Sequence, residues 1–236
     1  MLFRRKKFEV GRFLTRARGF DPLEAQAYEE LVSHYLAHGT RVTPKPFGLK
    51  LIVVSDTHGD LGFGNKFEEF FSGVAAYDLC LILGDLCPYE LERVLTLVPK
   101  EKLLALRGNH DRPDLLDQFG IPNLNGKTVT HRGVTFAGIE GSFRYKKGEW
   151  PMYTHYESLL LASGMSKGAD VLLTHDRAFL SAQYDHAHAG LAGITYYLFE
   201  HGIPLHIHGH LHKSYRKAYP NGAVEQSVYG CEYIEI

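Results

Sequence analysis

The spacing of hydrophobic residues changes near residue 48. Before that point, one apolar residue recurs at every fourth position, which predicts an amphipathic helix that ends at Gly39. This apolar stripe consists of Leu23, Ala27, Leu31 and Tyr35. Asp21 and Glu24 have the spacing of a capping box around Pro22, so the helix is predicted to begin there. The proline-containing segment 43–48 that follows is typical of a linker.

Short apolar runs alternate with helical patterns after residue 48. Buried strands are predicted at 49–55, 78–83, 102–106, 169–174 and 204–208. Helices are predicted at 65–76, 88–98 and 187–201, and shorter β-segments at 127–130 and 134–139. The runs 214–218, 223–228 and 232–236 are predicted to be antiparallel strands, with a hairpin turn at Asn221–Gly222. Strand–helix alternation followed by strands predicts an α/β sandwich with mixed sheets.

These patterns divide the chain into an N-terminal helical extension, residues 1–48, and a larger unit, residues 49–236. The chain has 236 residues, of which 44% are hydrophobic and 22% charged, which excludes disordered, collagen-like and disulfide-scaffold classes. Its three cysteines are too few for a disulfide or zinc framework, which favours a reducing compartment and a cytoplasmic location. No apolar run reaches the roughly 18 residues of a membrane span.

The N-terminal segment is strongly basic. Residues 1–18 carry seven basic side chains and one acidic one, whereas the whole chain has a formal net charge of −1 at pH 7. Such a segment either contacts nucleic acid or an anionic membrane surface, or is a solvated tail. It lacks the apolar stretch of a secretory signal and contains no serine, unlike a typical organellar transit peptide. Nucleic acid is therefore one candidate partner, through residues 1–18.

Polar side chains follow five of the predicted buried strands. They belong to the segments 55–58, 84–85, 107–111, 174–176 and 208–212, which include several of the chain's 14 histidines. In open α/β sheets, ligands bind at the carboxyl ends of strands, so these side chains are expected to share one edge. Each segment alone could be an ordinary turn. Burying so many carboxylates and imidazoles without compensation would be costly, however, and together they predict a metal site.

The candidate ligands are oxygen and imidazole nitrogen atoms, with no thiolate among them. This set suits manganese, iron, zinc or nickel rather than calcium, and manganese is the preferred choice. The candidates are too many for one ion, so two divalent ions that share a carboxylate are expected. Two-metal sites of this kind activate water and bind a phosphoryl oxygen.

The order of these segments resembles the calcineurin-like metallophosphoesterase family. The matching blocks are Asp56-x-His58, Gly84-Asp85, Gly108-Asn109-His110-Asp111, His175 and Gly209-His210-x-His212. The resemblance implies a four-layer α/β/β/α sandwich of two mixed β-sheets flanked by helices, to which the N-terminal helical extension is added. It also implies a dinuclear centre. The first metal would be held by Asp56, His58 and His212, the second by Asn109, His175 and His210, and Asp85 would bridge the two.

The same resemblance implies catalytic roles for His110 and Asp111. A hydroxide between the two metals would attack phosphorus in line. His110 would protonate the leaving alkoxide or stabilise its charge. Asp111 would orient His110 through a hydrogen bond.

Three further residues are candidate substrate contacts. Arg177 follows His175 where the family often has prolines, and it either contacts phosphate or is an ordinary surface side chain. His186 and His188 belong to a stretch that resembles an Asp-x-x-His-x-Gly sequence in some bacterial members. That stretch either lines the substrate pocket or is a polar helix start capped by Asp185.

The unit 49–236 lacks the long inserts that a large polymer substrate would favour. We therefore expect a small phosphodiester or phosphomonoester, with a nucleotide-like substrate favoured. Four aromatic residues between positions 143 and 153 either stack on a base of the substrate or form a hydrophobic cluster of their own. These are Phe143, Tyr145, Trp150 and Tyr153. One alternative is a nuclease or RNA-processing phosphodiesterase guided by residues 1–18. Another is a non-catalytic scaffold of the same fold, against which the complete ligand set argues. The sequence does not indicate an oligomeric state.

Overall fold

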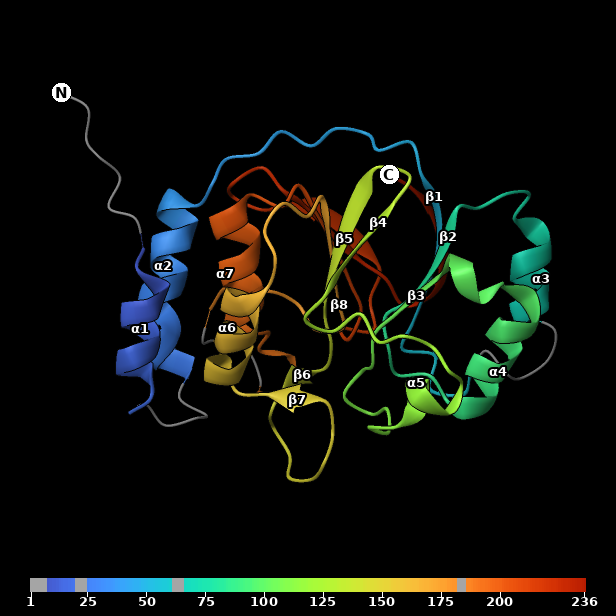
Figure 1. Cartoon of the computed structure of the whole chain (residues 1–236), viewed down its shortest axis with the longest axis horizontal. Helices are drawn as coiled ribbons and strands as arrows, with labels where there is room; N and C mark the ends of the chain where they lie inside the picture. The colour runs from blue at the N-terminus through green and yellow to red at the C-terminus, as the bar shows by residue number, and fades with distance from the viewer. Residues whose placement is uncertain (1–7, 20–24, 61–65, 182–185) are drawn as a thin grey trace.

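The computed structural model describes residues 8–19, 25–60, 66–181 and 186–236. The expected helix start at Asp21–Glu24 lies outside these residues. Two β-sheets stand back to back between layers of helices (Figure 1). The predicted fold class, α/β with two mixed sheets flanked by helices, is thereby confirmed.

The first sheet has four strands in the order β12-β1-β2-β3. Its strands are β1 (Lys50–Ser55), β2 (Leu79–Ile82), β3 (Leu103–Ala105) and β12 (Gly230–Glu235). Strands β1, β2 and β3 are parallel, and β12 is antiparallel to β1. Side chains of β1 alternate between two cores, as a pleated strand requires. Leu51 and Val53 pack between the two sheets, whereas Ile52 and Val54 pack against the helices.

The second sheet has six strands in the order β10-β11-β9-β8-β5-β4. They are β4 (Thr128–His131), β5 (Val134–Ile139), β8 (Val171–Thr174), β9 (Leu205–His208), β10 (Tyr215–Ala218) and β11 (Val224–Ser227). The predicted antiparallel pairing of the last three strands is correct only in part. β10 and β11 are antiparallel, but β11 is parallel to β9, and β12 joins the other sheet. An apolar run predicts a strand without identifying its partner.

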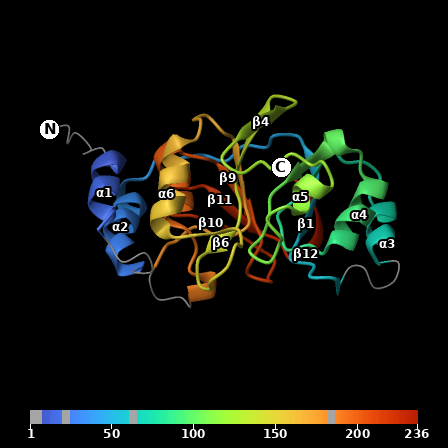
Figure 2. The same cartoon turned by 60° about the horizontal axis from the view of Figure 1, so that its bottom comes forward.

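Helices cover the outer faces of both sheets (Figure 2). On the first sheet lie α3 (Lys66–Gly73), α4 (Pro88–Leu97) and α5 (Leu115–Gln118), and on the second lie α6 (His155–Gly164) and α7 (Ala192–His201). The shorter elements are β6 (Ser142–Phe143), β7 (Met152–Tyr153) and the 3-10 turns η1 (Ala25–Tyr28), η3 (Lys100–Lys102) and η4 (His186–His188). In the described part of the chain, no helix has the length and apolar character needed to cross a membrane.

Several helices differ from the sequence prediction, which contains neither α5 nor the helix at Val10–Ala17. Helix α6 is not predicted, because its buried face includes His155 and Ser158 while Leu160 is exposed, so it lacks a clean apolar stripe. Its capping box, in which Thr154 and Glu157 exchange hydrogen bonds, was the available signal. The helix expected at 187–201 begins only at Ala192.

The N-terminal extension forms an additional layer on α6 and α7 (Figure 1). Its helices are α1 (Val10–Ala17) and α2 (Glu29–His38). Phe13, Leu31 and Tyr35 are buried in the same hydrophobic core as the residues of α7. Residues 10–17 are therefore not a solvated tail, although they belong to the basic segment. The boundary at residue 48 stays a prediction.

Glu140, just after β5, joins the two sheets through a buried polar network. Arg107, which follows β3, donates two hydrogen bonds to its carboxylate at 2.8 and 2.7 Å. Asn123, Asn125 and Tyr153 also donate to it, at 2.7, 3.1 and 3.2 Å. Because Arg107 and Glu140 come from different sheets, this network fixes one sheet against the other.

We expect Leu31→Ala to lower the free energy of unfolding by about 2–5 kcal/mol, because Leu31 is 0% exposed and its loss leaves a cavity. Urea denaturation followed by circular dichroism measures the change. Leu160→Ala is the control, since Leu160 is 52% exposed. Equal effects of the two substitutions would show that the extension does not contribute to the stability of the fold.

We expect Glu140→Ala to destabilise the protein by about 3–5 kcal/mol, because it leaves the Arg107 guanidinium without its buried partner. Arg112→Ala removes an exposed ion pair with Asp114 and should cost at most about 1 kcal/mol. Both values come from the same denaturation experiment. A loss below about 1 kcal/mol for Glu140→Ala would contradict a structural role for the network.

Candidate metal centre

The seven predicted metal ligands follow strands of both sheets. Asp56 and His58 follow β1, Asp85 follows β2, Asn109 follows β3, His175 follows β8, and His210 and His212 follow β9. The distance of 3.5 Å from His175 Nε2 to Asp85 Oδ2 shows that the strand ends of the two sheets meet. The structure therefore brings all five polar segments to one edge.

One group of potential ligands is fully buried. It consists of Asp56, Asp85, His175 and His210, whose ligand atoms all lie within 4.8 Å of one another. Asn109 lies beside this group, with its Oδ1 atom 2.9 Å from His175 Nε2. This arrangement combines the residues predicted for the second metal with Asp56, which is predicted for the first.

The other group lies nearer the surface and consists of Asp56, His58 and His212. His58 Nε2 lies 3.2 Å from His212 Nε2, and His212 Nε2 lies 3.6 Å from Asp56 Oδ1. Asp85 Oδ2 lies 3.7 Å from His58 Nε2, so this carboxylate reaches both groups. The carboxylate that belongs to both groups is Asp56, so the bridging role of Asp85 and the individual ligand assignments stay predictions.

The two carboxylates each present one unsatisfied oxygen to this space. Asp56 Oδ2 accepts hydrogen bonds from the Ser55 hydroxyl and the His210 amide, and Asp85 Oδ1 accepts one from the His110 amide. Asp56 Oδ1 and Asp85 Oδ2 are buried and have no hydrogen-bond partner among the described residues. Buried polar atoms are seldom left unpaired. With neighbouring imidazole nitrogens, these oxygens fit divalent transition metals.

The backbone around the ligands adopts a conformation that non-glycine residues usually avoid. Positive φ angles of 55°, 44°, 59°, 67° and 48° occur at Asp56, His58, Asp85, His210 and His212. Each such residue stores strain of about 1–3 kcal/mol, and it persists only where the surroundings impose it. Among the described non-glycine residues, Arg132 in a hairpin turn is the remaining case. The strain is therefore concentrated where the side chains must converge.

Two glycines allow the ligand loops to approach one another. A Cβ atom on Gly108 would lie 2.1 Å from Asp85 Oδ1, and one on Gly209 would lie 1.9 Å from Ser55 Oγ. Any side chain at either position would displace a carboxylate or its hydrogen-bond partner.

The two carboxylates of the buried group favour a positive charge next to them. Burial lowers the pKa of His175, but the carboxylates of Asp85 and Asp56 outweigh burial and raise this pKa to about 10. Burial raises the pKa of Asp85 and of Asp56, but the charge of His175 and the hydrogen bonds to each carboxylate together outweigh burial, and both pKa values fall. A divalent cation competes with the His175 proton for the same lone pair.

Backbone carbonyls orient the two buried imidazoles. His175 Nδ1 lies 2.8 Å from the Leu83 carbonyl oxygen, and His210 Nε2 lies 2.6 Å from the Ala187 carbonyl oxygen. Each carbonyl accepts the ring N–H, which leaves Nε2 of His175 and Nδ1 of His210 available to a metal.

A model of the calcineurin-like phosphoesterase superfamily domain matches residues 49–224. The chain belongs to this superfamily. It is therefore a metal-dependent phosphoesterase, a hydrolase, whose possible metal site is the His/Asp cluster described above.

The phosphoesterase is similar to several solved structures at low sequence identity. Phosphopantetheinyl hydrolase from Mycobacterium tuberculosis is 14% identical with a TM-score of 0.52, over 77% of this chain and 89% of that one. A dimetal phosphatase from Danio rerio is 12% identical with a TM-score of 0.46, over 79% and 88% of the two chains. Among curated proteins, none matches the sequence.

Asp111 of the phosphoesterase does not bind His110 in the expected way. Its carboxylate accepts hydrogen bonds from the backbone amides of Gly108, Asp85 and Leu86 at 2.7, 2.9 and 3.1 Å. Burial and the Asp85 charge raise the pKa of Asp111 to about 7. The expected hydrogen bond to the His110 side chain is therefore replaced by a role in shaping the two ligand loops.

His110 is exposed at the rim of the centre, and two residues that the sequence prediction did not pair with it lie nearby. Its Nε2 atom is 3.4 Å from the Tyr145 hydroxyl, and its Nδ1 atom is 3.4 Å from Lys146 Nζ. Burial lowers the pKa of His110, the Asp85 charge opposes this, and the Lys146 charge reinforces it. Lys146 belongs to no sequence motif. The loop of residues 144–151 lies 34 or more positions after His110, so the sequence does not show that the two residues are neighbours.

The structure describes the side chains of two of the three candidate substrate contacts, and these lie in different environments. Arg177 is buried, so the surface alternative is wrong, and it interacts electrostatically with His206 and Tyr219 on the helix-covered face of the second sheet. The His188 ring lies 5.0 Å from the His210 ring, at the edge of the buried ligand group. The side chain of His186 lies outside the described part of the structure, as does Asp185. Substrate contact by these residues stays a prediction.

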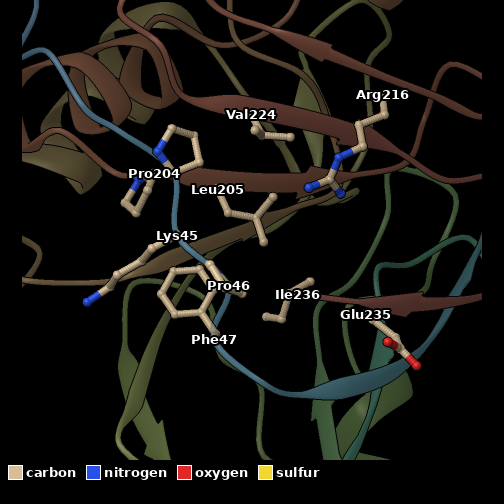
Figure 3. Close-up of a pocket in the computed structure, with 10 residues that line it drawn as sticks. Lys45, Pro46, Phe47, Pro204, Leu205, Arg216, Val224, Glu235 and Ile236 are labelled. Carbon is tan, nitrogen blue, oxygen red and sulfur yellow. The ribbon is translucent and has the colours of Figure 1, made fainter.

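A cavity of about 240 Å³ lies away from the phosphoesterase centre (Figure 3). The linker residues 44–47 form one wall, and Leu205, Val224 and Ile236 form another. Leu205 begins β9, whereas the ligand His210 follows the opposite end of that strand. The cavity and the ligands therefore lie at opposite ends of the sheet.

We expect Asp85→Asn to weaken metal binding at least about 100-fold, because the amide removes the charge that faces both ligand groups. Elemental analysis after chelator stripping and reloading with manganese measures the bound metal. Asp117→Asn, in an exposed position on α5, is the control. Full metal retention by Asp85→Asn would contradict the assignment of this edge as the metal centre.

Proposed function

We propose that the protein hydrolyses a small phosphodiester or phosphomonoester, with a nucleotide-like substrate favoured, at a centre that holds two divalent metal ions. The observation that carries the proposal is the pair of buried, unpartnered oxygens of Asp56 and Asp85 between two groups of imidazoles. When bound, two such ions polarise a phosphoryl oxygen and supply a water-derived nucleophile at neutral pH.

His110 is the proposed proton donor to the leaving oxygen. Its ring centroid is 5.4 Å from that of His58, so it borders the ligand groups without belonging to either. It is exposed, so a substrate can reach it. A positioned acid of this kind contributes about 10²–10⁴ to the rate.

Exposed aromatic rings at the rim support a substrate with a planar group. Tyr229 stacks on His212 at 5.3 Å between ring centroids, and Trp150 is 39% exposed on the loop beside His110. Phe143 and Tyr153 do not contribute, because Phe143 is buried and Tyr153 hydrogen-bonds Glu140. Every nucleic-acid base can stack on an aromatic ring, so such rings suit a nucleotide.

The nuclease alternative has weaker support. Arg12 pairs with Glu9 and Arg16 pairs with Glu30, so two cations of the basic segment are already partnered by acids. The scaffold alternative predicts a lost ligand, whereas every residue predicted as a ligand is present in the sequence.

We expect manganese-loaded wild type to bind about two ions per chain and to hydrolyse an aryl phosphomonoester, an aryl phosphodiester or both. His110→Ala should retain the metal and lose about 10²–10⁴ in kcat, because only the proton donor is removed. Steady-state assays and elemental analysis on the same samples measure both. Arg112→Ala, in an exposed position outside the centre, is the control.

Full activity of His110→Ala would contradict its role as the acid. Two bound ions without turnover of either ester would contradict hydrolysis of a small substrate. Cleavage of single-stranded oligonucleotides under those conditions, lost when Arg4, Arg5, Lys6 and Lys7 are replaced by glutamine, would favour the nuclease alternative instead.

A further inference from the structure

The loop between β6 and β7 places a lysine beside His110. Lys146 Nζ lies 3.4 Å from His110 Nδ1. The same ammonium lies 4.8 Å from the centroid of the Trp150 ring and 5.4 Å from that of Tyr145. Aromatic faces attract cations at such distances, so both rings help to hold the ammonium in place. A Cβ atom on Gly148 would lie 2.8 Å from the Trp150 ring, so glycine is required for the loop to fold back.

The loop is also attached to the ligand edge. The Tyr145 hydroxyl accepts a hydrogen bond from Asn109 Nδ2 at 3.0 Å. Asn109 Oδ1 faces His175, so this bond fixes which end of the amide points toward the buried ligand group. The position of Lys146 is thus set relative to the end of β3, and not only by its own loop.

The charge of Lys146 is not neutralised within the described part of the protein. None of the ion pairs among those residues includes it, whereas the neighbouring Arg144 pairs with Glu157. Lys146 is half-buried, and a partly desolvated cation attracts an anion more strongly than one in bulk water. Because its ammonium is 3.4 Å from the His110 ring, a phosphoryl group that contacts His110 is also within reach of Lys146.

We propose that Lys146 contacts an anionic phosphoryl oxygen of the substrate and makes the site selective for phosphomonoesters. The inference rests on the proposed function, because it requires a phosphoryl group at His110. A phosphomonoester has a second pKa of about 6 and is largely a dianion at neutral pH, whereas a diester is a monoanion. A charge-assisted hydrogen bond from Lys146 stabilises the additional charge of the monoester. In a diester, an organic substituent replaces that oxygen.

Three variants test this assignment. Lys146→Gln removes the charge, Lys146→Arg keeps it, and Lys147→Gln removes the same charge from the exposed neighbouring residue. Two quantities are measured on metal-loaded protein at constant ionic strength. One is the ratio of kcat/KM for an aryl phosphomonoester to that for an aryl phosphodiester. The other is the affinity for inorganic phosphate by calorimetry, which does not depend on turnover.

We expect Lys146→Gln to lower the monoester-to-diester ratio about 10- to 100-fold and to weaken phosphate binding about tenfold, as loss of a charge-assisted hydrogen bond implies. Lys146→Arg should retain most of the preference, and Lys147→Gln should change both quantities less than about twofold, because a fully exposed charge contributes little. Equal ratios and equal phosphate affinities for Lys146→Gln and Lys147→Gln would overturn the inference. Phosphate binding that depends on Lys146, without turnover of either ester, would contradict the proposed function and still support the anion contact.

Discussion

The carboxylates of Asp56 and Asp85 place the strongest constraint on this structure. Both are buried, both lie beside His175, and one oxygen of each has no hydrogen-bond partner among the described residues. Such a pair is stable only next to positive charge, which the imidazoles supply in part when protonated. The strained φ angles and the close approach of Gly108 and Gly209 follow from the need to bring these groups together.

Two other buried carboxylates hold the framework around that pair. Asp111 accepts three backbone N–H groups from the loops after β2 and β3, and Glu140 accepts side-chain donors that connect the ends of β3 and β5. Both oxygens of Asp111 and of Glu140 accept hydrogen bonds, whereas one oxygen of Asp56 and one of Asp85 accepts none among the described residues. A fully bonded carboxylate rigidifies its surroundings, whereas an oxygen left unbonded is available to a ligand. Among these four carboxylates, the difference in hydrogen bonding separates the two that support the framework from the two proposed to bind metal.

The sequence predicted the features that depend on local pattern. Apolar runs located β1, β2, β8 and β9, and the polar residues that follow them converge at one edge as expected. It did not predict which sheet β12 joins, because strand pairing depends on contacts between distant segments. Nor did it predict α6, whose buried His155 and Ser158 face other elements of the fold. The partners of Asp111 were missed for the same reason, since a side chain that accepts backbone amides leaves no pattern in the sequence.

The proposed metal ligands and the proposed substrate contact lie on different kinds of structural element. The proposed ligands directly follow buried strands, so core packing fixes their positions. Lys146 and Trp150 lie on a loop that is held by ring contacts and by hydrogen bonds that include the one from Asn109 to Tyr145. Within the described part of the chain, Lys146 and Trp150 bond to neither Asp56 nor Asp85, so they can change without altering the carboxylate pair. Loops of this kind let one framework serve many substrates, which is why the selectivity of this chain is argued from Lys146 rather than from its fold.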